Sequence, residues 1–196
     1  MSKTQIPTGV EAHDAIDSQH YADGSIDTAH VADSQITTAK IGTLTQIAFN
    51  STQSASANAN TLDDYEEGVW TPVWQGLSGS AGSSSTSASG AVYTKIGRTV
   101  SFSCQARWSN QGSYSGLAVL TGLPFTSSSS NSSGCAFGFI ELIDFKGGTL
   151  ISAQIAGSQT YITWREINDD GSPTGLDVSA LDNGSNDMVV TGQYIV

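Results

Sequence analysis

A ten-residue repeat runs from Ala15 to Gly42 in this 196-residue chain. Apolar anchors recur at every fifth position of the repeat, and the residues between them are mostly small or polar. These anchors are Ile16, Tyr21, Ile26, Val31, Ile36 and Ile41. Because a repeat unit with so few apolar side chains cannot bury them alone, the pattern predicts a fibre of several identical chains. We expect a homotrimer whose axis is lined by Ile16, Ile26, Ile36 and Ile41.

The period of the repeat also limits the local structure of the fibre. Ten residues match neither of the helical periods, roughly 3.6 and 3.5 residues per turn, so a long coiled coil is not expected. Asp17, Asp27 and Thr37 each follow the isoleucine of a repeat, where they can cap a single helical turn. Burial of one isoleucine is worth roughly 1.5–3 kcal/mol. Four such positions in each of three chains therefore offset much of the entropy cost of ordering the shaft.

The net charge and the composition exclude several classes of partner. The formal net charge is −11 and the seven Lys and Arg residues are scattered, so the chain lacks the basic clusters that nucleic acids require. Its acidity also disfavours an anionic membrane surface. No apolar run reaches the length of a membrane-spanning helix, and Met1–Gln5 lacks the hydrophobic region of a secretory signal. We expect a protein made in a cytosol, with no nucleic-acid partner and no membrane insertion.

The chain has two cysteines, Cys104 and Cys135. Two cysteines make no disulfide framework, and we expect both to be buried as small apolar side chains. A bridge between them would require their strands to be neighbours.

Changes in composition divide the chain into four segments. Residues 1–14 are expected to anchor the chain, and residues 15–42 form the repeat shaft. Residues 43–62 lose the register of the repeat and include a stretch rich in Ser, Ala and Asn, which is typical of a linker. The acidic run around Leu62–Gly68 marks the start of a head domain, which we expect to span residues 63–196.

The head has the pattern of a β protein. The clearest signal is an alternation of apolar and polar residues over 100–107, which follows a turn expected at Gly97 and Arg98. Further strands are expected over 69–74, 91–96, 117–120, 134–140, 149–155, 160–167 and 188–196. Serine-rich segments at 78–90 and 126–133 are expected to be loops, and 169–173 and 182–185 to be turns. Short strands at this spacing predict a β-sandwich with jelly-roll-like character.

The repeat and both ends of the head carry a resemblance to a known class of protein. The repeat segments 25–33 and 36–41 resemble the short repeats of bacteriophage tail fibres, particularly those of phages that infect cyanobacteria and other aquatic bacteria. The segments 60–72, 91–98 and 190–196 resemble the C-terminal domain that accompanies such repeats, whereas residues 104–185 match only in texture. The resemblance implies a trimeric, mainly β receptor-binding fibre of the virion, with its N-terminal end toward the particle. It implies no particular receptor.

Residues 1–14 leave the place of the fibre in the virion open. Typical tail fibres are longer and have a dedicated N-terminal adaptor, which these fourteen residues do not match. We expect residues 1–14 to dock into another virion structural protein. The chain then acts as a tail fibre that attaches the virion to host surface glycan, or as a capsid fibre or decoration protein. A glycan-cleaving tailspike is a third possibility.

The residues for catalysis are poorly placed in this sequence. The carboxylates Asp63, Asp64, Glu66 and Glu67 imitate a glycosidase pair in composition, but cleavage needs two carboxyls at a set separation across a sugar. Adjacent positions at a domain boundary favour a structural role instead. The three histidines, His13, His20 and His30, all precede the head, so the head has no Ser-His-Asp arrangement. We expect a protein that is not an enzyme and uses no cofactor.

Two patterns raise the question of a metal. His20 and His30 would each form a ring of three imidazoles if they faced a three-fold axis, but the isoleucines fit that axis better. The histidines then face solvent or cap a turn. The acidic segments 169–171 and 182–187 resemble calcium-binding loops in composition but lack the spacing of an EF-hand. We therefore predict no metal site.

Binding is the remaining kind of chemistry for the head. Trp108, Asn110 and Tyr114 place two aromatic residues around a polar tip, and aromatic faces with neutral hydrogen-bonding groups suit sugars. We predict these three residues as the receptor-binding site. In the alternative reading, Trp108 ends a strand and packs inward. Trp70 and Trp74 are expected to seal the head onto the shaft.

Overall fold

The computed structural model describes part of the chain. The described residues are 26, 29–32, 35–37, 41, 62, 64–82, 84–130, 132–141, 148–168, 170–181 and 186–196. The chain divides into two compact units, Met1–Ala48 and Phe49–Val196. The predicted anchor, Ile16, His20 and most of the predicted linker lie outside the described residues. In the first unit, Ile26, Ile36 and Ile41 are 49%, 61% and 44% exposed in the single chain.

The second unit is an antiparallel sheet with one short 3₁₀ helix in its described part. Its elements in chain order are β1 (Tyr65–Val69), β2 (Val73–Ser80), β3 (Ser85–Ile96), β4 (Thr99–Asn110), β5 (Ser113–Thr121), β6 (Ser133–Glu141), β7 (Gly148–Ile155), β8 (Tyr161–Asn168), β9 (Pro173–Gly175), η2 (Val178–Ala180) and β10 (Asn186–Ile195). The strand order is β1-β3-β4-β10-β6-β7-β8-β5-β2, with β9 beside β8. The prediction of a mainly β protein is confirmed. The repeat shaft and the jelly-roll character stay predictions.

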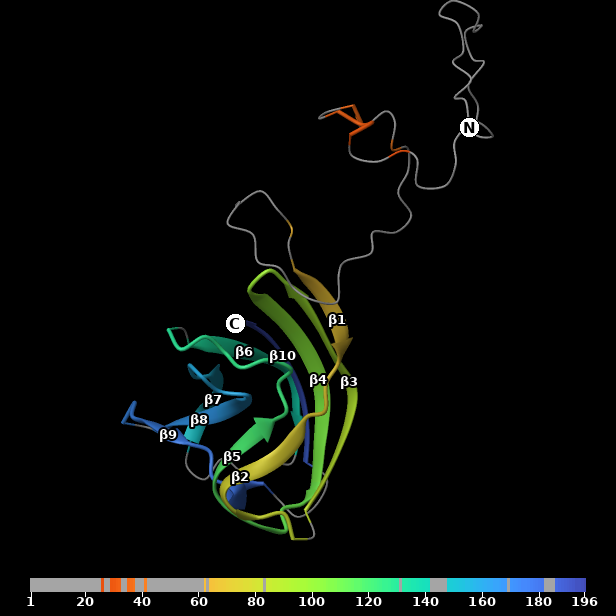
Figure 1. The fold of residues 1–196 in the computed structure, drawn as a ribbon. Coiled ribbons are helices and arrows are strands. Elements are labelled where there is room, and N and C mark those ends of the chain that lie inside the picture. The colour runs from red at the N-terminus through yellow and green to blue at the C-terminus, as the bar shows by residue number, and fades with distance from the viewer. Residues whose placement is uncertain are drawn as a thin grey trace, which may run out of the picture. The chain divides into compact units, whose positions relative to one another are not determined.

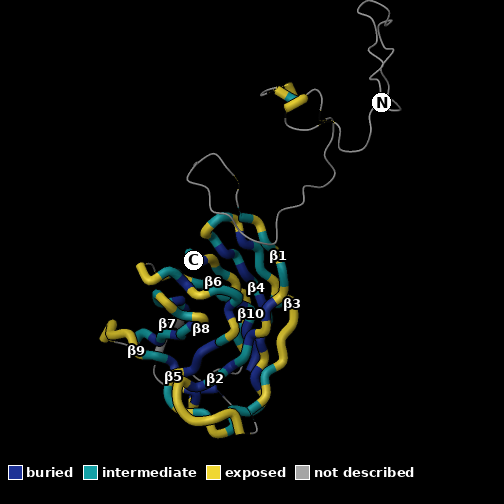
Figure 2. Tube along the Cα trace, in the orientation of Figure 1, coloured by how far each residue is buried: buried dark blue, intermediate teal, exposed yellow. Residues whose placement is uncertain are grey.

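The sheet curls until its two halves face each other. Figure 1 shows β3, β4 and β10 on one side of the unit and β2, β5 and β8 on the other. Trp74 of β2 ties the two sides together, because its backbone N–H donates to Oγ1 of Thr86 on β3 and its indole Nε1 donates to the carbonyl of Ala106 on β4. Residues of both halves therefore enclose one core, which appears as the buried inner side of the strands in Figure 2.

The strongest predicted signal is confirmed by the β3–β4 hairpin. These strands join at Gly97, which has φ 56°, and Arg98. Val100, Phe102, Cys104 and Ala106 of β4 are buried, as the alternation predicts, while Ser101, Ser103 and Gln105 are only partly covered. The final strand, β10, lies between β4 and β6, so the end of the chain is at the centre of the sheet.

One strand prediction and one loop prediction are wrong. The strand expected over Val69–Trp74 is interrupted at Trp70–Pro72, because the chain leaves β1 there and continues as β2 on the opposite side of the sheet. The loop expected over Ser78–Gly90 contains the end of β2 and the first half of β3. Its serines have weak strand propensity, but Ser85–Ser89 pair with β4, whose buried alternation fixes the register.

Four tryptophans build the core of the head. Trp74, Trp108 and Trp164 are almost fully buried, and the Trp74 ring centroid lies 5.8 Å from that of Trp108 and 5.2 Å from that of Trp164. Trp70 meets the Phe102 ring edge-on at 5.8 Å. The expectation that Trp70 and Trp74 seal the head onto the shaft is therefore replaced. Both side chains belong to the core of the head, where such rings contribute large apolar area.

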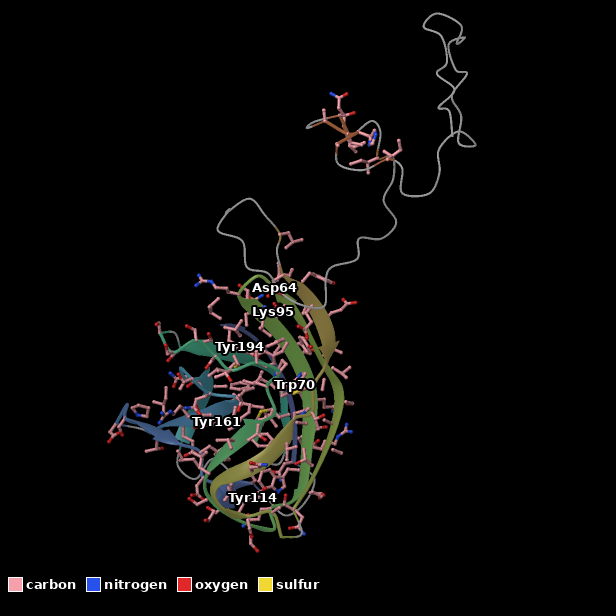
Figure 3. The ribbon with its side chains drawn as sticks, in the orientation of Figure 1. Asp64, Trp70, Lys95, Tyr114, Tyr161 and Tyr194 are labelled. Carbon is pink, nitrogen blue, oxygen red and sulfur yellow. The ribbon has the colours of Figure 1, made fainter. Side chains whose placement is uncertain are left out.

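The predicted acidic boundary segment is held by polar contacts to β3. Asp64 forms a buried ion pair with Lys95, and the Lys95 Nζ lies 5.5 Å from the centroid of the Phe125 ring. The Tyr93 hydroxyl donates to Oε1 of Glu66 at 2.5 Å. Figure 3 places Asp64 and Lys95 together where β1 begins, at the end of the head away from Tyr114. These carboxylates have structural partners, which agrees with the structural role expected for them.

The two cysteines are unbridged. Cys104 lies on β4 and Cys135 on β6, and β10 runs between these strands. Their strands are thus not neighbours, which was the condition for a bridge.

No helix within the described residues is long and apolar enough to cross a membrane.

Candidate ligand-binding face

Four neighbouring strands present a polar surface on the side of the sheet away from the core. Since residues directly opposite each other share a face of the sheet, the strand register defines this surface. One row runs through Ser87, Arg107, Asp187 and Glu141, and the next through Ser89, Gln105, Val189 and Phe139. We call these eight residues the outer face. The buried residues Ala106 and Trp108 alternate with it along β4.

A hydrogen-bond network centred on Asp187 orders the outer face. Arg107 Nε donates to Asp187 Oδ2 at 2.8 Å, and Gln105 Nε2 donates to the same oxygen at 2.7 Å. Ser89 Oγ in turn donates to Gln105 Oε1 at 3.1 Å. Asp187 thereby holds two donors of β4, Arg107 and Gln105, on one carboxylate oxygen.

Asp187 is buried, whereas its partner Arg107 reaches solvent. The side chain of Asp187 is 9% exposed and that of Arg107 is 51% exposed. The second carboxylate oxygen, Oδ1, is buried and accepts no hydrogen bond from any described residue. A buried carboxylate oxygen without a donor is uncommon in folded proteins. Because Oδ1 is covered, a ligand from outside meets this network at Arg107 and not at that oxygen.

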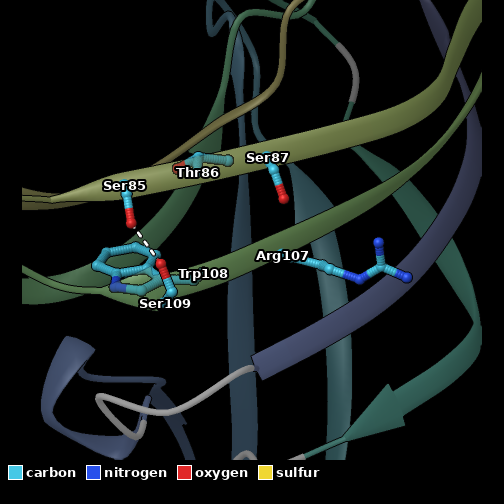
Figure 4. Close-up of a pocket in the computed structure, with 6 residues that line it drawn as sticks. All are labelled: Ser85, Thr86, Ser87, Arg107, Trp108 and Ser109. Carbon is cyan, nitrogen blue, oxygen red and sulfur yellow. Dashed lines mark hydrogen bonds between the residues drawn. The ribbon is translucent and has the colours of Figure 1, made fainter.

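A groove lies beside this network, between β3 and β4. It has a volume of about 260 Å³ and is lined by Ser85, Thr86, Ser87, Arg107, Trp108 and Ser109. Figure 4 shows Ser85 and Ser109 hydrogen-bonded at one end of the groove and Arg107 extending toward the neighbouring strand at the other. Serine hydroxyls both donate and accept, so the groove offers both kinds of partner.

Phe139 adds an exposed aromatic ring to the outer face. It is 47% exposed and lies opposite Val189, which lies opposite Gln105. Two strand spacings separate Phe139 from Gln105, about 10 Å between backbones. A ring at this separation from the polar groups suits a ligand with one apolar face and a hydroxylated edge.

Of the predicted receptor-binding residues, Trp108 lines the groove, but its side chain has another position than expected. Its side chain is fully buried and packs against Trp74 and, at 6.3 Å, against Tyr114. Trp108 thus packs inward, as in the alternative reading, because it occupies an inward position of the alternating strand β4. Asn110 is half-buried and lies opposite Ser85, with its Oδ1 accepting from the N–H of Gly112 at 2.8 Å.

Sequence reasoning missed Arg107, Asp187 and Phe139. Arg107 and Asp187 are 80 positions apart in the chain, so only the strand order brings them together. One sequence signal points to Arg107, because it continues the series of polar residues at alternate positions of β4.

No group of three or more His, Cys, Asp or Glu side chains in the described parts of the chain is arranged to hold a metal ion. His30 is exposed in the single chain. His20 and most of the acidic segment 182–187 fall on residues that the structure does not describe, so those alternatives stay untested.

Comparison with known proteins gives one likeness of fold. No family model matches the chain, and no curated protein matches it. The chain is similar to a solved structure of the Dettilon tailspike protein, with 22% identity and a TM-score of 0.52 over 67% of this chain. The chain spans only 24% of the length of that tailspike. The curled β fold of the head is thus shared with part of a tailspike protein.

Proposed function

We propose that this chain is a virion fibre protein, of the phage tail, that attaches the particle to its host by binding surface glycan. Residues 1–14 dock into another virion protein, the repeats join three copies through Ile16, Ile26, Ile36 and Ile41, and the head carries the binding face. The resemblance of the repeats to tail fibres supports this function. The fold that the head shares with part of a tailspike supports it independently.

The network on the outer face supplies the chemistry for a sugar. Arg107, whose side chain is 51% exposed, and Gln105 can donate to ring or hydroxyl oxygens of a sugar, and Asp187 holds both donors in place. Phe139 can stack on the apolar face of a pyranose. The two hydrogen bonds by which the covered Asp187 carboxylate holds Arg107 and Gln105 are the observation on which this site depends most.

The predicted residues Asn110 and Tyr114 stay part of the proposed receptor-binding site, at the end of β4 and the start of β5. Asn110 lies directly opposite Ser85, which lines the groove. In this arrangement Trp108 supports the groove from the core side and makes no stacking contact. The receptor-binding residues that we propose are therefore Arg107, Gln105, Phe139 and Asn110, with Asp187 positioning the first two.

Weak binding at each head is sufficient for attachment. Three heads on one fibre bind with an effective concentration set by their tether, so avidity exceeds the affinity of one site. Several fibres on one particle multiply the same effect.

A binding assay with two arginine variants tests the site. Fluorescently labelled full-length protein is applied to an array of bacterial surface polysaccharides, and Arg107→Ala is compared with Arg98→Ala. Arg98 is an exposed residue in the β3–β4 turn, so its loss changes the net charge equally. We expect a glycan signal that Arg107→Ala lowers about tenfold, equivalent to one charge-assisted hydrogen bond, and that Arg98→Ala retains. Equal signals from both variants, or no glycan bound by the wild type, would contradict the proposal.

Two further measurements separate the alternatives. Fragments released from a bound polysaccharide would assign glycan cleavage and overturn the expectation that the protein is not an enzyme. Labelling of the chain on intact particles, viewed by electron microscopy, distinguishes a tail fibre from a capsid fibre or decoration protein.

A further inference from the structure

Four large apolar side chains lie exposed at one end of the sheet, on β1 and β3. They are Tyr65, Val69, Val92 and Ile96, with exposures of 38%, 80%, 48% and 52%. Tyr65 lies opposite Ile96, and Val69 lies opposite Val92, so all four share one face. We call this set the β1–β3 patch. An exposed apolar cluster with polar surroundings is typical of a contact surface.

The patch has sharp limits and almost no charge. On the neighbouring strand β4 the same face continues with Ser101 and Ser103, which are polar. Among the described residues of β1 and β3 on this face, the one ionised side chain is Glu67, which lies between the patch pairs and opposite Thr94, and its Oε2 accepts from the Tyr65 hydroxyl at 2.8 Å. The patch is therefore apolar and nearly neutral in a chain whose net charge is −11. An identical surface can approach it with little repulsion.

We propose that the β1–β3 patch is the contact between heads of three copies of this chain, with Val69 closest to the three-fold axis. This inference rests on the proposed homotrimer and adds the head surface that joins it. A residue at a three-fold axis contacts the same residue of the other copies. We place Val69 there because it is the most exposed side chain of the patch.

The tether identifies a second copy as the partner. Residues 42–64 separate Ile41 from the start of β1, and a segment of this length spans at most about 80 Å when fully extended. Heads of chains joined at their repeats are then held at effective concentrations on the order of millimolar. Stable interfaces between free partners bury about 800 Å² on each side, which is more area than four side chains supply. The same patch is sufficient between heads that a shaft already holds together.

Cross-linking of full-length Val69→Cys tests the contact directly. A short bismaleimide is added at neutral pH, and covalent dimers are counted on a denaturing gel. The matched control is Leu77→Cys, whose parent side chain on β2 is 48% exposed but lies outside the patch. The native Cys104 is buried and Cys135 is half-buried, so wild-type protein gives the background. We expect dimers from Val69→Cys well above both controls. Dimer yields equal to those of Leu77→Cys would overturn the inference.

Sedimentation gives a second, independent test. Val69→Asp places a charge at the proposed axis, and Leu77→Asp places the same charge elsewhere, with circular dichroism confirming that both variants fold. We expect the concentration of half-dissociation to rise about tenfold or more for Val69→Asp alone. If both variants weaken the trimer equally, this contact is overturned but the proposed homotrimer is not. A monomeric wild type would overturn both, while the arginine comparison on the array would still decide the glycan site.

Discussion

Asp187 on β10 and Arg107 on β4 form a salt bridge of 2.8 Å between a buried carboxylate and a guanidinium that reaches solvent. Exposed ion pairs contribute little to stability, because water and salt screen both charges. This pair differs, since Asp187 is covered and also accepts from Gln105. Asp187 thus holds two side-chain donors, those of Arg107 and Gln105, on one carboxylate oxygen.

A double-mutant cycle measures how strongly these two residues are coupled. We expect Arg107→Ala and Asp187→Ala each to lower the free energy of unfolding, and the cycle to give a coupling of about 0.5–3 kcal/mol. Urea unfolding followed by tryptophan fluorescence supplies the values. A coupling indistinguishable from zero would mean that the pair behaves as an ordinary surface ion pair.

The buried ion pair between Lys95 and Asp64 predicts a larger effect on stability. Lys95→Met removes a cation that is only 5% exposed and with it the ion pair to the Asp64 carboxylate, which is 12% exposed. We expect a loss of about 3–5 kcal/mol in the free energy of unfolding. Adding Asp64→Leu removes the negative charge as well and should recover most of that loss. A double variant as unstable as Lys95→Met would instead assign the effect to the packing of Lys95 against Phe125.

The sequence predicted the parts of this fold in which one face of a strand is apolar. Alternation over β4 identified the strand and its buried side, because each inward position must be apolar to fill the core. The first half of β3 carries no such signal. Its Ser and Ala residues pair through their backbones, and their side chains are too small to show which face is buried.

The candidate site was less predictable than the fold. A tryptophan beside a polar tip suggested an exposed ring at Trp108, but the inward position of this residue on β4 buries it. Asp187 and Phe139 face Arg107 and Gln105 only because β10 and β6 follow β4 in the sheet. Strand order of this kind depends on long-range packing, so local sequence patterns do not contain it.

Burial should make both thiols unreactive in the folded protein. It raises the pKa of Cys104 to about 12, with a smaller effect from nearby Cys135, and burial alone raises the pKa of Cys135 to about 12. Because the thiolate is the reactive form, we expect no reaction with Ellman's reagent at pH 8 until denaturant is added. Two thiols per chain should then react together. Release of one thiol in the native state would show that Cys135 is more accessible than this structure indicates.

Stability should fall at alkaline pH, in two stages. The ordinary pKa values are 9.0 for the thiols and 10.0 for the tyrosines. A hydrogen bond to Glu66, then burial, raises the pKa of Tyr93 to about 12, and burial does the same for Tyr194. Each raised pKa gives stability that is complete below the unfolded value and is lost as pH rises through the folded one. The free energy of unfolding should therefore be level near neutral pH, decline from about pH 9 as unfolded thiols ionise, and decline more steeply from about pH 10.

Two variants separate these stages. Tyr93→Phe keeps the ring against Phe125 but has no proton to lose, so it should reduce only the decline above pH 10. Cys104→Ala should reduce the decline that begins near pH 9. Urea unfolding at closely spaced pH values, followed by tryptophan fluorescence, gives both slopes. If Tyr93→Phe follows the wild-type curve at every pH, the Tyr93 hydroxyl does not hold its proton through Glu66 in solution.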